Sequence, residues 1–392
     1  MPRDRGRSDA RSGPSAFARL VASCATVGVV GAMIVPPAAA QSTSAPASDP
    51  VDVARRGGEA WLSGRQQPDG GFALGGLPGV ETPESILALA GEAQTSDVWS
   101  AREAIDRIEA LTGPEPGRSA LDALAGLAAE ASTARDAALL VTRVALPLQM
   151  EPTAFDPDRT GRPVDLIGLL DGARTTDATA SLAEVITAQV AVGGEPSPEL
   201  LDALAGRVLD GGGWGVDEDS DTVDIASTSA AVVALVAAGQ DPSGEPVAGS
   251  MATLVTLEND DGGWGPEEST ATDTAAVITA LRAVGFDPGD VCWQEEYRGS
   301  SDGGRTPVAY LLDSQSEAGH WGDPGETIST AVALQALNGR WLPIARGETR
   351  SCGGGFDWPL PAVPPALLVV IGVGLVGVIG SARILRGGDT GV

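Results

Sequence analysis

The stretch Asp260-Asp261-Gly262-Gly263-Trp264-Gly265 leads, after a short acidic loop, into Thr274-Ala275-Ala276-Val277-Ile278-Thr279-Ala280-Leu281. Paired glycines readily take the positive φ that ends a helix, and a run of small and apolar residues favours the start of another. The pattern occurs three more times, at Gln66-Gln67-Pro68-Asp69-Gly70-Gly71-Phe72, Asp210-Gly211-Gly212-Gly213-Trp214-Gly215 and Gly319-His320-Trp321-Gly322. The chain is therefore built from repeated helical hairpins.

Apolar periodicity, interrupted by glycine and proline, predicts an all-α domain of about twelve helices over residues 51–339. One hairpin cannot bury its own apolar face, so six hairpins must stack or close into a ring. We also expect a long loop over 147–176 with a short helix at 164–171. The twelve helices are expected at 51–65, 83–92, 98–112, 118–131, 133–146, 177–192, 197–209, 225–239, 245–258, 271–285, 304–315 and 326–339.

The aromatic residue of each turn can pack into the seam between neighbouring hairpins. The residues that define the turns are Gly70, Gly71 and Phe72, then Gly212, Gly213 and Trp214, then Gly262, Gly263 and Trp264, and finally Trp321. In the last turn His320 stands where the other repeats have glycine, so we interpret it as a turn residue.

Both ends of the chain have the composition of targeting segments. Residues 1–40 combine a basic head, a short apolar stretch and Ala38-Ala39-Ala40, which is typical of a secretory signal peptide cleaved after Ala40. Residues 41–50 are predicted to be a flexible leader. Residues 362–382 carry no charge and would span roughly 31 Å as a helix, about one hydrocarbon core. Residues 340–361 then form a juxtamembrane segment.

The charge pattern sets the expected topology and partners. Arg383 and Arg386 follow the apolar segment, so residues 383–392 should be a cytoplasmic tail and the ring should be extracellular. This makes the chain a single-pass type I protein of the cell membrane, in contact with the lipid bilayer through 362–382. The net charge of −28 argues against nucleic acid as a partner.

Two of the three cysteines, Cys292 and Cys352, remain after removal of the signal peptide. An even number of cysteines in an oxidising compartment predicts one disulfide between them. We expect Cys292 to lie in the loop between the helices at 271–285 and 304–315.

The Asp-Gly-Gly-Trp/Phe turns and Thr-Ala-Ala-Val helices resemble the repeats of the squalene cyclase and protein prenyltransferase superfamily. The resemblance covers residues 51–339, clearly in four repeats and faintly between 95 and 195. It implies an α/α toroid, in which six inner helices follow the turns and six outer helices surround them around a central cavity. The cobalamin-carrier proteins share this toroid.

The resemblance also identifies where catalytic residues would lie. Cyclases of the superfamily protonate their substrate with the third residue of an Asp-x-Asp-Asp-Thr-Ala motif, and in Thr270-Ala271-Thr272-Asp273-Thr274-Ala275 that residue is Thr272. A threonine cannot protonate an alkene. The alternative acids are Asp219 and Asp221, one repeat earlier. The predicted inner helices also lack the aromatic faces that commonly stabilise carbocations.

Metal binding has weak support in the sequence. Prenyltransferases hold zinc with Asp, Cys and His, but this chain has one histidine and its exported cysteines are predicted to be paired. Asp217, Asp219 and Asp221 have the alternate spacing of a calcium loop but not the glycine and glutamate of an EF-hand. We predict no cofactor and leave an irregular calcium site or a solvated acidic loop as alternatives.

Three functions agree with these observations. The first is a non-catalytic, membrane-anchored binding protein that captures an apolar or bulky ligand, isoprenoid or cobalamin-like, or a protein partner. The second is a terpene-cyclase-like enzyme that uses Asp221 as its acid. The third is a structural spacer whose ring is filled.

Overall fold

The computed structural model describes residues 49–72, 79–96, 98–111, 118–299, 304–322 and 327–344. The predicted signal peptide, span and cytoplasmic tail, and Cys352, lie outside these ranges. Among the helices that are described, none is both long enough and apolar enough to cross a membrane. The last two residues of the predicted leader, Asp49 and Pro50, belong to the first helix, because Asp49 caps it and Pro50 begins it; the rest of the leader lies outside the described ranges.

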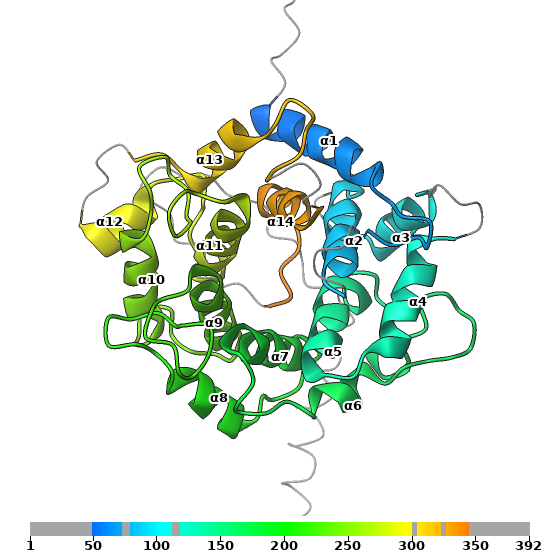
Figure 1. Cartoon of the computed structure of the whole chain (residues 1–392), viewed down its shortest axis with the longest axis horizontal. Helices are drawn as coiled ribbons and strands as arrows, with labels where there is room; N and C mark the ends of the chain where they lie inside the picture. Colours follow the sequence, from blue (N-terminus) through cyan, green and yellow to red (C-terminus); the bar gives the residue numbers. More distant parts are fainter. Residues whose placement is uncertain are drawn as a thin grey trace, which may run out of the picture. The chain divides into compact units, whose positions relative to one another are not determined.

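Six helices form a closed inner ring (Figure 1). Each packs against the next in chain order, and the last packs against the first. Around the ring they are α2 (Glu81–Glu92), α5 (Ala134–Leu140) with the π-helix η1 (Val141–Ala145), α7 (Thr179–Ala191), α9 (Ile225–Ala237), α11 (Ala271–Ala283) and α14 (Thr327–Asn338).

The remaining helices lie outside this ring, so the described residues form the two-layered α/α toroid that was predicted. The outer helices are α1 (Pro50–Ser63), α3 (Ala101–Glu109), α4 (Ala120–Glu130), α6 (Leu166–Leu170), α8 (Pro198–Ala205), α10 (Val247–Thr256), α12 (Cys292–Arg298) and α13 (Pro307–Ser314), together with the 3₁₀ turn η2 (Pro152–Ala154). The described ranges hold only isolated β-bridges, Phe155 with Val164 and Trp264 with Thr270.

All the predicted helices are present, and the four that follow the Gly-Gly-aromatic turns are inner helices, as predicted. The short helix predicted at 164–171 is α6. The position of Cys292 was wrong, because this residue is the first of α12, a helix that the sequence analysis missed.

The chain departs from regular hairpins in the region where the repeats are faint. Helices α3 and α4 both lie in the outer layer, and the inner helices η1 and α7 are joined through the short outer helix α6. The burial pattern explains this difference. Helix α3 buries one stripe, Ala101, Ala104 and Ile108, whereas the end of α5 is buried on every side. A helix with one apolar stripe belongs in an outer layer.

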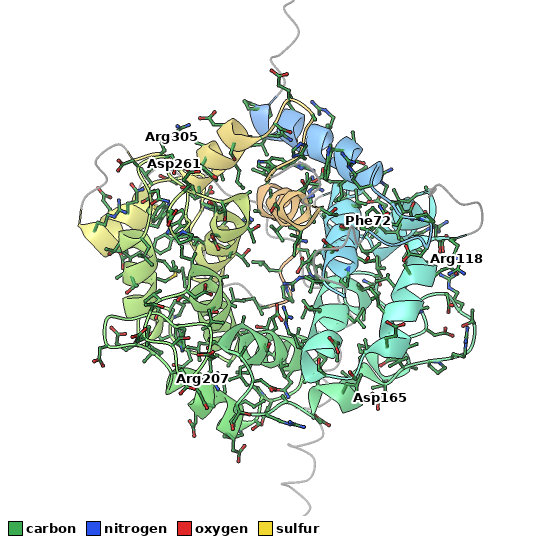
Figure 2. The ribbon with its side chains drawn as sticks, in the orientation of Figure 1. Phe72, Arg118, Asp165, Arg207, Asp261 and Arg305 are labelled. Atoms are coloured by element: carbon green, nitrogen blue, oxygen red, sulfur yellow. The ribbon has the colours of Figure 1, made fainter. Side chains whose placement is uncertain are left out.

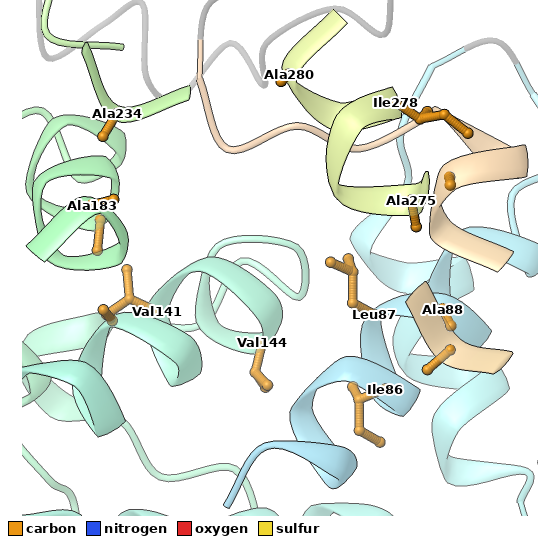
Figure 3. Packing of buried hydrophobic residues seen from close by; sticks show 14 of the residues in the cluster. Ile86, Leu87, Ala88, Val141, Val144, Ala183, Ala234, Ala275, Ile278 and Ala280 are labelled. Atoms are coloured by element: carbon orange, nitrogen blue, oxygen red, sulfur yellow. The ribbon is translucent and has the colours of Figure 1, made fainter. Parts of the chain in front are cut away.

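The core lies between and around the inner helices. Figure 3 shows Val141 of η1 beside Ala183 of α7, and Ile278 of α11 pointing toward α14. Small residues such as Ala183 and Ala234 are fully buried there. Short side chains allow helix axes to approach closely, so six helices can close a narrow ring.

The four turns repeat one set of contacts. In each turn, the backbone N–H of the aromatic residue donates to a threonine hydroxyl near the start of the next inner helix. The pairs are Phe72–Thr82 (3.0 Å), Trp214–Thr228 (2.9 Å), Trp264–Thr274 (3.0 Å) and Trp321–Thr330 (3.1 Å). These bonds fix every turn at the same end of an inner helix, so these helices all begin at one mouth of the ring.

The tryptophans make a second repeated contact, with the outer helices. Each indole N–H donates over 2.7 Å to a leucine carbonyl, Trp214 to Leu204, Trp264 to Leu254 and Trp321 to Leu311. All three rings are fully buried. Each tryptophan bond thus joins an outer helix to the inner helix that follows it, within one hairpin. Trp321 also packs against Gly58 of α1, in the predicted seam to the next hairpin.

Candidate functional site

Three inner helices turn a face of uncharged residues toward the ring axis. The residues are spaced three, four or seven apart, which places them on one side of a helix. They keep accessible surface although their helices are surrounded by an outer layer. The residues are Ala226, Ala230 and Ala237 of α9, Thr272, Ala276 and Thr279 of α11, and Ile328, Val332 and Gln335 of α14.

The orientation of α14 confirms this assignment. Leu334 packs outward against α1, where a Cβ on Gly58 would lie 2.8 Å from its side chain. Val332 lies almost opposite Leu334 on the helical wheel, so it faces the axis. We call the faces of α9 and α11 the small-residue wall; Ile328 and Val332 of α14 continue it with longer apolar side chains. The wall is neutral, and the inner helices carry no aromatic residue.

The other half of the ring carries charged side chains. Arg143 of η1 donates from Nε to Glu84 of α2 over 2.9 Å, and Arg135 of α5 donates to Glu184 of α7 over 3.1 Å. Gln335 of α14 also donates to the Glu84 carboxylate, over 2.7 Å. We call these residues the charged network. It joins four consecutive members of the ring.

Burial determines the electrostatics of this network. The Glu84 side chain is 7% exposed and that of Arg143 is 23% exposed. Burial alone would lower the pKa of Arg143, but the charges of Glu84 and Glu184 outweigh it and raise that pKa. For Glu184, burial raises the pKa more than Arg135 and Arg143 lower it. Glu184 therefore holds a proton more readily than a surface glutamate.

The mouth at the far ends of the inner helices is crossed by the chain itself. Arg340, just after α14, donates to the carbonyls of Gln94 and Ser96 beyond the end of α2, both over 2.9 Å. Trp341 packs on Trp99 with ring centroids 5.0 Å apart. Ile344 packs with Val233 and Ala283 near the ends of α9 and α11.

We call residues 339–344 the C-terminal strap. They include the first residues of the predicted juxtamembrane segment, which therefore begins against the ring. Because the strap contacts Gln94 beyond the end of α2, and α9 and α11 through Ile344, it runs across this mouth (Figure 1).

The predicted acidic residues lie elsewhere. Asp217, Asp219 and Asp221 are exposed in the loop between α8 and α9. Asp217 accepts hydrogen bonds from the backbone N–H of Asp219 (3.2 Å) and the Ser220 hydroxyl (2.7 Å), so its carboxylate folds onto its own loop. Within the described ranges, no three acidic, histidine or cysteine side chains are placed to hold a metal ion.

The residues that match the cyclase motif have structural partners. The hydroxyl of Thr272, at the acid position, lies 3.0 Å from that of Ser329 on α14. Asp273 accepts a hydrogen bond from the Thr270 hydroxyl over 2.9 Å at the start of α11. Burial, together with the charge of Asp224, raises the pKa of Asp273 although the Thr270 bond lowers it.

The two remaining predictions concern His320 and the disulfide. The His320 carbonyl accepts from Ser316 N–H over 2.9 Å, as the Gly71, Gly213 and Gly263 carbonyls accept in the other turns, which confirms it as a turn residue. Its ring packs on Trp61 of α1. Cys292 is disulfide-bonded. Since Cys352 lies outside the described residues, the pairing of the two stays a prediction.

The charged network and the strap were missed from the sequence. A signal for the network existed, because Glu184 and Arg143 interrupt helices that are otherwise nearly uncharged, TASLAEVITAQVA and VTRVA. A charge inside such a helix needs a partner. The strap had a weaker signal, the aromatic and apolar residues of Trp341-Leu342-Pro343-Ile344.

No protein-family model matches the chain, and no curated protein matches it either. Among solved structures, it is similar to ent-copalyl diphosphate synthase from Streptomyces platensis, with 19% sequence identity and a TM-score of 0.41. The match covers 67% of this chain and 50% of the synthase, so the chain spans about half the length of that enzyme.

Proposed function

We propose that this protein is a non-catalytic binding protein whose ring holds an apolar ligand against the small-residue wall. The observation that carries the proposal is the accessible surface of Ala226, Ala230 and Ala276 on helices enclosed by an outer layer. Small neutral side chains leave room beside them. An apolar group that covers them is stabilised by roughly 25 cal/mol per Å² of apolar surface removed from water.

The residues at the cyclase motif support binding over catalysis. Thr272 is bonded to Ser329 at the acid position, and Asp221 is solvent-exposed in an outer loop. The wall offers no aromatic face to a carbocation. An isoprenoid chain or another apolar group would therefore be held without being transformed.

The strap favours one route of entry. Trp341 and Ile344 lie across the mouth at the far ends of the inner helices, which favours entry of the ligand from the mouth where these helices begin. We further propose that the ring is tethered to the outside of the cell membrane through residues 362–382. External protease on intact cells should then remove the ring and spare a small C-terminal stub; an intact chain in accessible cells contradicts this.

Native mass spectrometry of the protein purified from its own host tests binding. We expect a co-purifying mass of isoprenoid to cobalamin size. The Ala230→Phe and Ala276→Phe variants, which fill the wall, should lose it. The control is Ala60→Phe, an exposed position on the outer helix α1. An absence of any such mass in the wild type, together with an Ala276→Phe variant that is destabilised because the ring has no room for the phenyl group, would support the filled spacer instead.

A second candidate is an acid-dependent enzyme that acts on the same apolar ligand. One observation favours it, the raised pKa of Glu184 together with the 22% exposure of its side chain. Incubation with squalene and linear C15 to C30 isoprenoids tests it. The binding proposal expects all of these to emerge unchanged. A cyclic product that disappears in Glu184→Gln or Asp221→Asn would replace it with the enzyme.

A further inference from the structure

A groove of about 320 Å³ lies on the outer side of the ring, away from the small-residue wall. One side is helix α4, and the other is the segment 155–164 that precedes α6. Its apolar lining includes Ala125, Ala129 and Val164, with the fully buried Phe155 beneath them, and its charged lining includes Arg118 and Arg162. Figure 2 shows Arg118 beside α4 at the outside of the molecule.

The acidic residues that line the groove already have partners. Asp122 accepts from the backbone N–H of Ser119 over 2.6 Å and from its hydroxyl over 2.9 Å, in the capping box of α4. Asp158 accepts from the Thr160 hydroxyl over 2.9 Å and the Thr160 N–H over 3.2 Å. Both carboxylates are thus directed into their own turns.

The arginines of the groove have no such partners. Within the described part of the chain, neither Arg118 nor Arg162 forms a hydrogen bond or an ion pair, and both are exposed. Burial would raise the pKa of Asp158, but hydrogen bonds from Thr160 outweigh it, and Arg162 lies near enough for its charge to lower that pKa as well. Two guanidinium groups are therefore available beside an apolar lining, in a chain with a net charge of −28.

The segment 155–164, on the side of the groove opposite α4, is held in shape by its own hydrogen bonds. Phe155 and Val164 exchange two backbone hydrogen bonds of 2.9 Å, which tie the ends of the segment together. Between them, the Asp156 carboxylate accepts from the N–H groups of Thr160 (3.1 Å) and Gly161 (2.8 Å). A segment that is ordered before binding reduces the entropy lost when a ligand is bound.

A glycine keeps the groove open on the other side. Gly126 lies in the middle of α4, where glycine destabilises a helix by about 1 kcal/mol relative to alanine. A Cβ at this position would meet no atom within 4 Å, so packing does not demand glycine there. Gly126 lines the groove, and its missing side chain leaves space above the apolar lining.

We propose that this groove binds a small organic anion, whose carboxylate lies between Arg118 and Arg162 and whose apolar part covers Ala129 and Val164. Guanidinium groups bind carboxylates with charge-assisted hydrogen bonds. The volume suits a compact ligand with one ring or a short chain. The site is on the outer layer, so it works independently of any ligand at the small-residue wall.

Calorimetric titration of the full chain in detergent with sodium benzoate tests the proposal. Sodium phosphate is the comparison anion, and sodium chloride keeps the ionic strength constant. We expect one benzoate per chain. Binding should weaken by about tenfold or more in the Arg118→Gln, Arg162→Gln double variant, since two charge-assisted bonds are removed. Arg56→Gln, at an exposed arginine on α1, is the matched control and should bind as the wild type does.

The Gly126→Leu variant distinguishes a loss of binding from a loss of folding. Leucine is a better helix former than glycine and meets no atom at its Cβ, so the thermal midpoint should rise or stay unchanged. Its side chain fills the groove, so benzoate binding should be lost. Absence of benzoate binding in the wild type overturns the proposal. An equal loss of benzoate binding in Arg56→Gln overturns the assignment of the site to Arg118 and Arg162. Phosphate binding as tight as benzoate binding overturns its specificity for organic anions.

Discussion

Gly319, in the last of the four turns, packs so closely against the first helix that a Cβ at position 319 would lie 2.5 Å from the Gly57 carbonyl oxygen. The Gln315 amide joins the same two segments, because its Nε2 donates to the carbonyls of Ala54 and Gly319, both over 2.8 Å. Gln315 and Ala54 are 261 residues apart in the sequence. This junction joins the last repeat to the first in the outer layer.

Replacement of Gly319 by alanine should therefore destabilise the whole ring. Its φ of +94° strains any residue with a side chain, and the new Cβ would also collide with the Gly57 backbone. We expect a loss of more than about 2 kcal/mol in the free energy of unfolding, measured by urea denaturation.

The control for this variant is Gly239→Ala. Gly239 has a similar φ of +90°, but its Cβ would meet no atom within 4 Å. It should lose only the roughly 1–2 kcal/mol of backbone strain. Equal losses in the two variants would show that the contact with Gly57 does not tighten the closure of the ring.

A second prediction concerns the bond between turn and inner helix. Thr274→Val keeps the shape of the side chain but leaves the buried Trp264 N–H without its acceptor, which lies at 3.0 Å in the wild type. A buried donor left unpaired costs about 1–3 kcal/mol. Chemical denaturation should show a loss in this range.

Thr279→Val is the matched control on the same helix. The Thr279 hydroxyl bonds only to the Ala275 carbonyl of its own helix, over 3.0 Å, and the residue is partly exposed. We expect a change below about 0.5 kcal/mol. If Thr279→Val is as damaging as Thr274→Val, the shared threonine bond is not what fixes the turns.

The four turns explain why so much of the fold could be predicted. Each is local in the sequence, since the aromatic residue closely follows the glycine and the threonine that it bonds lies 9 to 14 residues further on, as in Gly262, Trp264 and Thr274. Local turn chemistry therefore fixed which helices would be inner ones. Between 95 and 195 no such turn occurs, and there the hairpin assignment failed for α3 and α4.

The candidate sites were harder to predict because their residues come from distant segments. Arg143 and Glu84 are 59 residues apart, and Trp341 lies 199 residues from its hydrogen-bond acceptor Thr142. Proximity of this kind appears only once the ring has closed. The acidic loop at Asp217 and Asp221, which is conspicuous in the sequence, is exposed because its carboxylates bond locally or face solvent.

A third prediction is a pH dependence that arises from Glu258. Its side chain is 4% exposed and lies 3.0 Å from Arg298 of α12. Burial raises its pKa to about 7 from 4.5, although Arg298 and Gln294 act in the opposite direction. Between these pH values the folded protein holds a proton that the unfolded chain has released. Stability contributed by this group is present at low pH and is lost as the pH rises to about 7.

Thermal unfolding between pH 5 and 8 measures this effect. The wild type should lose up to about 3 kcal/mol relative to Glu258→Gln across that range, because the glutamine cannot ionise. Glu267→Gln, at an exposed loop position, should leave the wild-type profile unchanged. Parallel profiles of the wild type and Glu258→Gln would contradict the assignment of the raised pKa to Glu258.

The last prediction concerns the ion pair between Glu84 and Arg143, which ties α2 to η1 within the inner ring. Glu84 is 7% exposed, so Arg143→Leu would leave a buried carboxylate without its cation and should cost about 3–5 kcal/mol. Adding Glu84→Gln removes that uncompensated charge, and the double variant should be more stable than the sum of the single changes predicts, by at least about 1 kcal/mol.

The exposed pair Arg102 and Asp106, 3.8 Å apart on α3, is the control and should give a coupling below about 0.5 kcal/mol. Urea denaturation of both double-mutant cycles provides the measurement, and additive changes at Glu84 and Arg143 would mean that the pair does not couple the two helices.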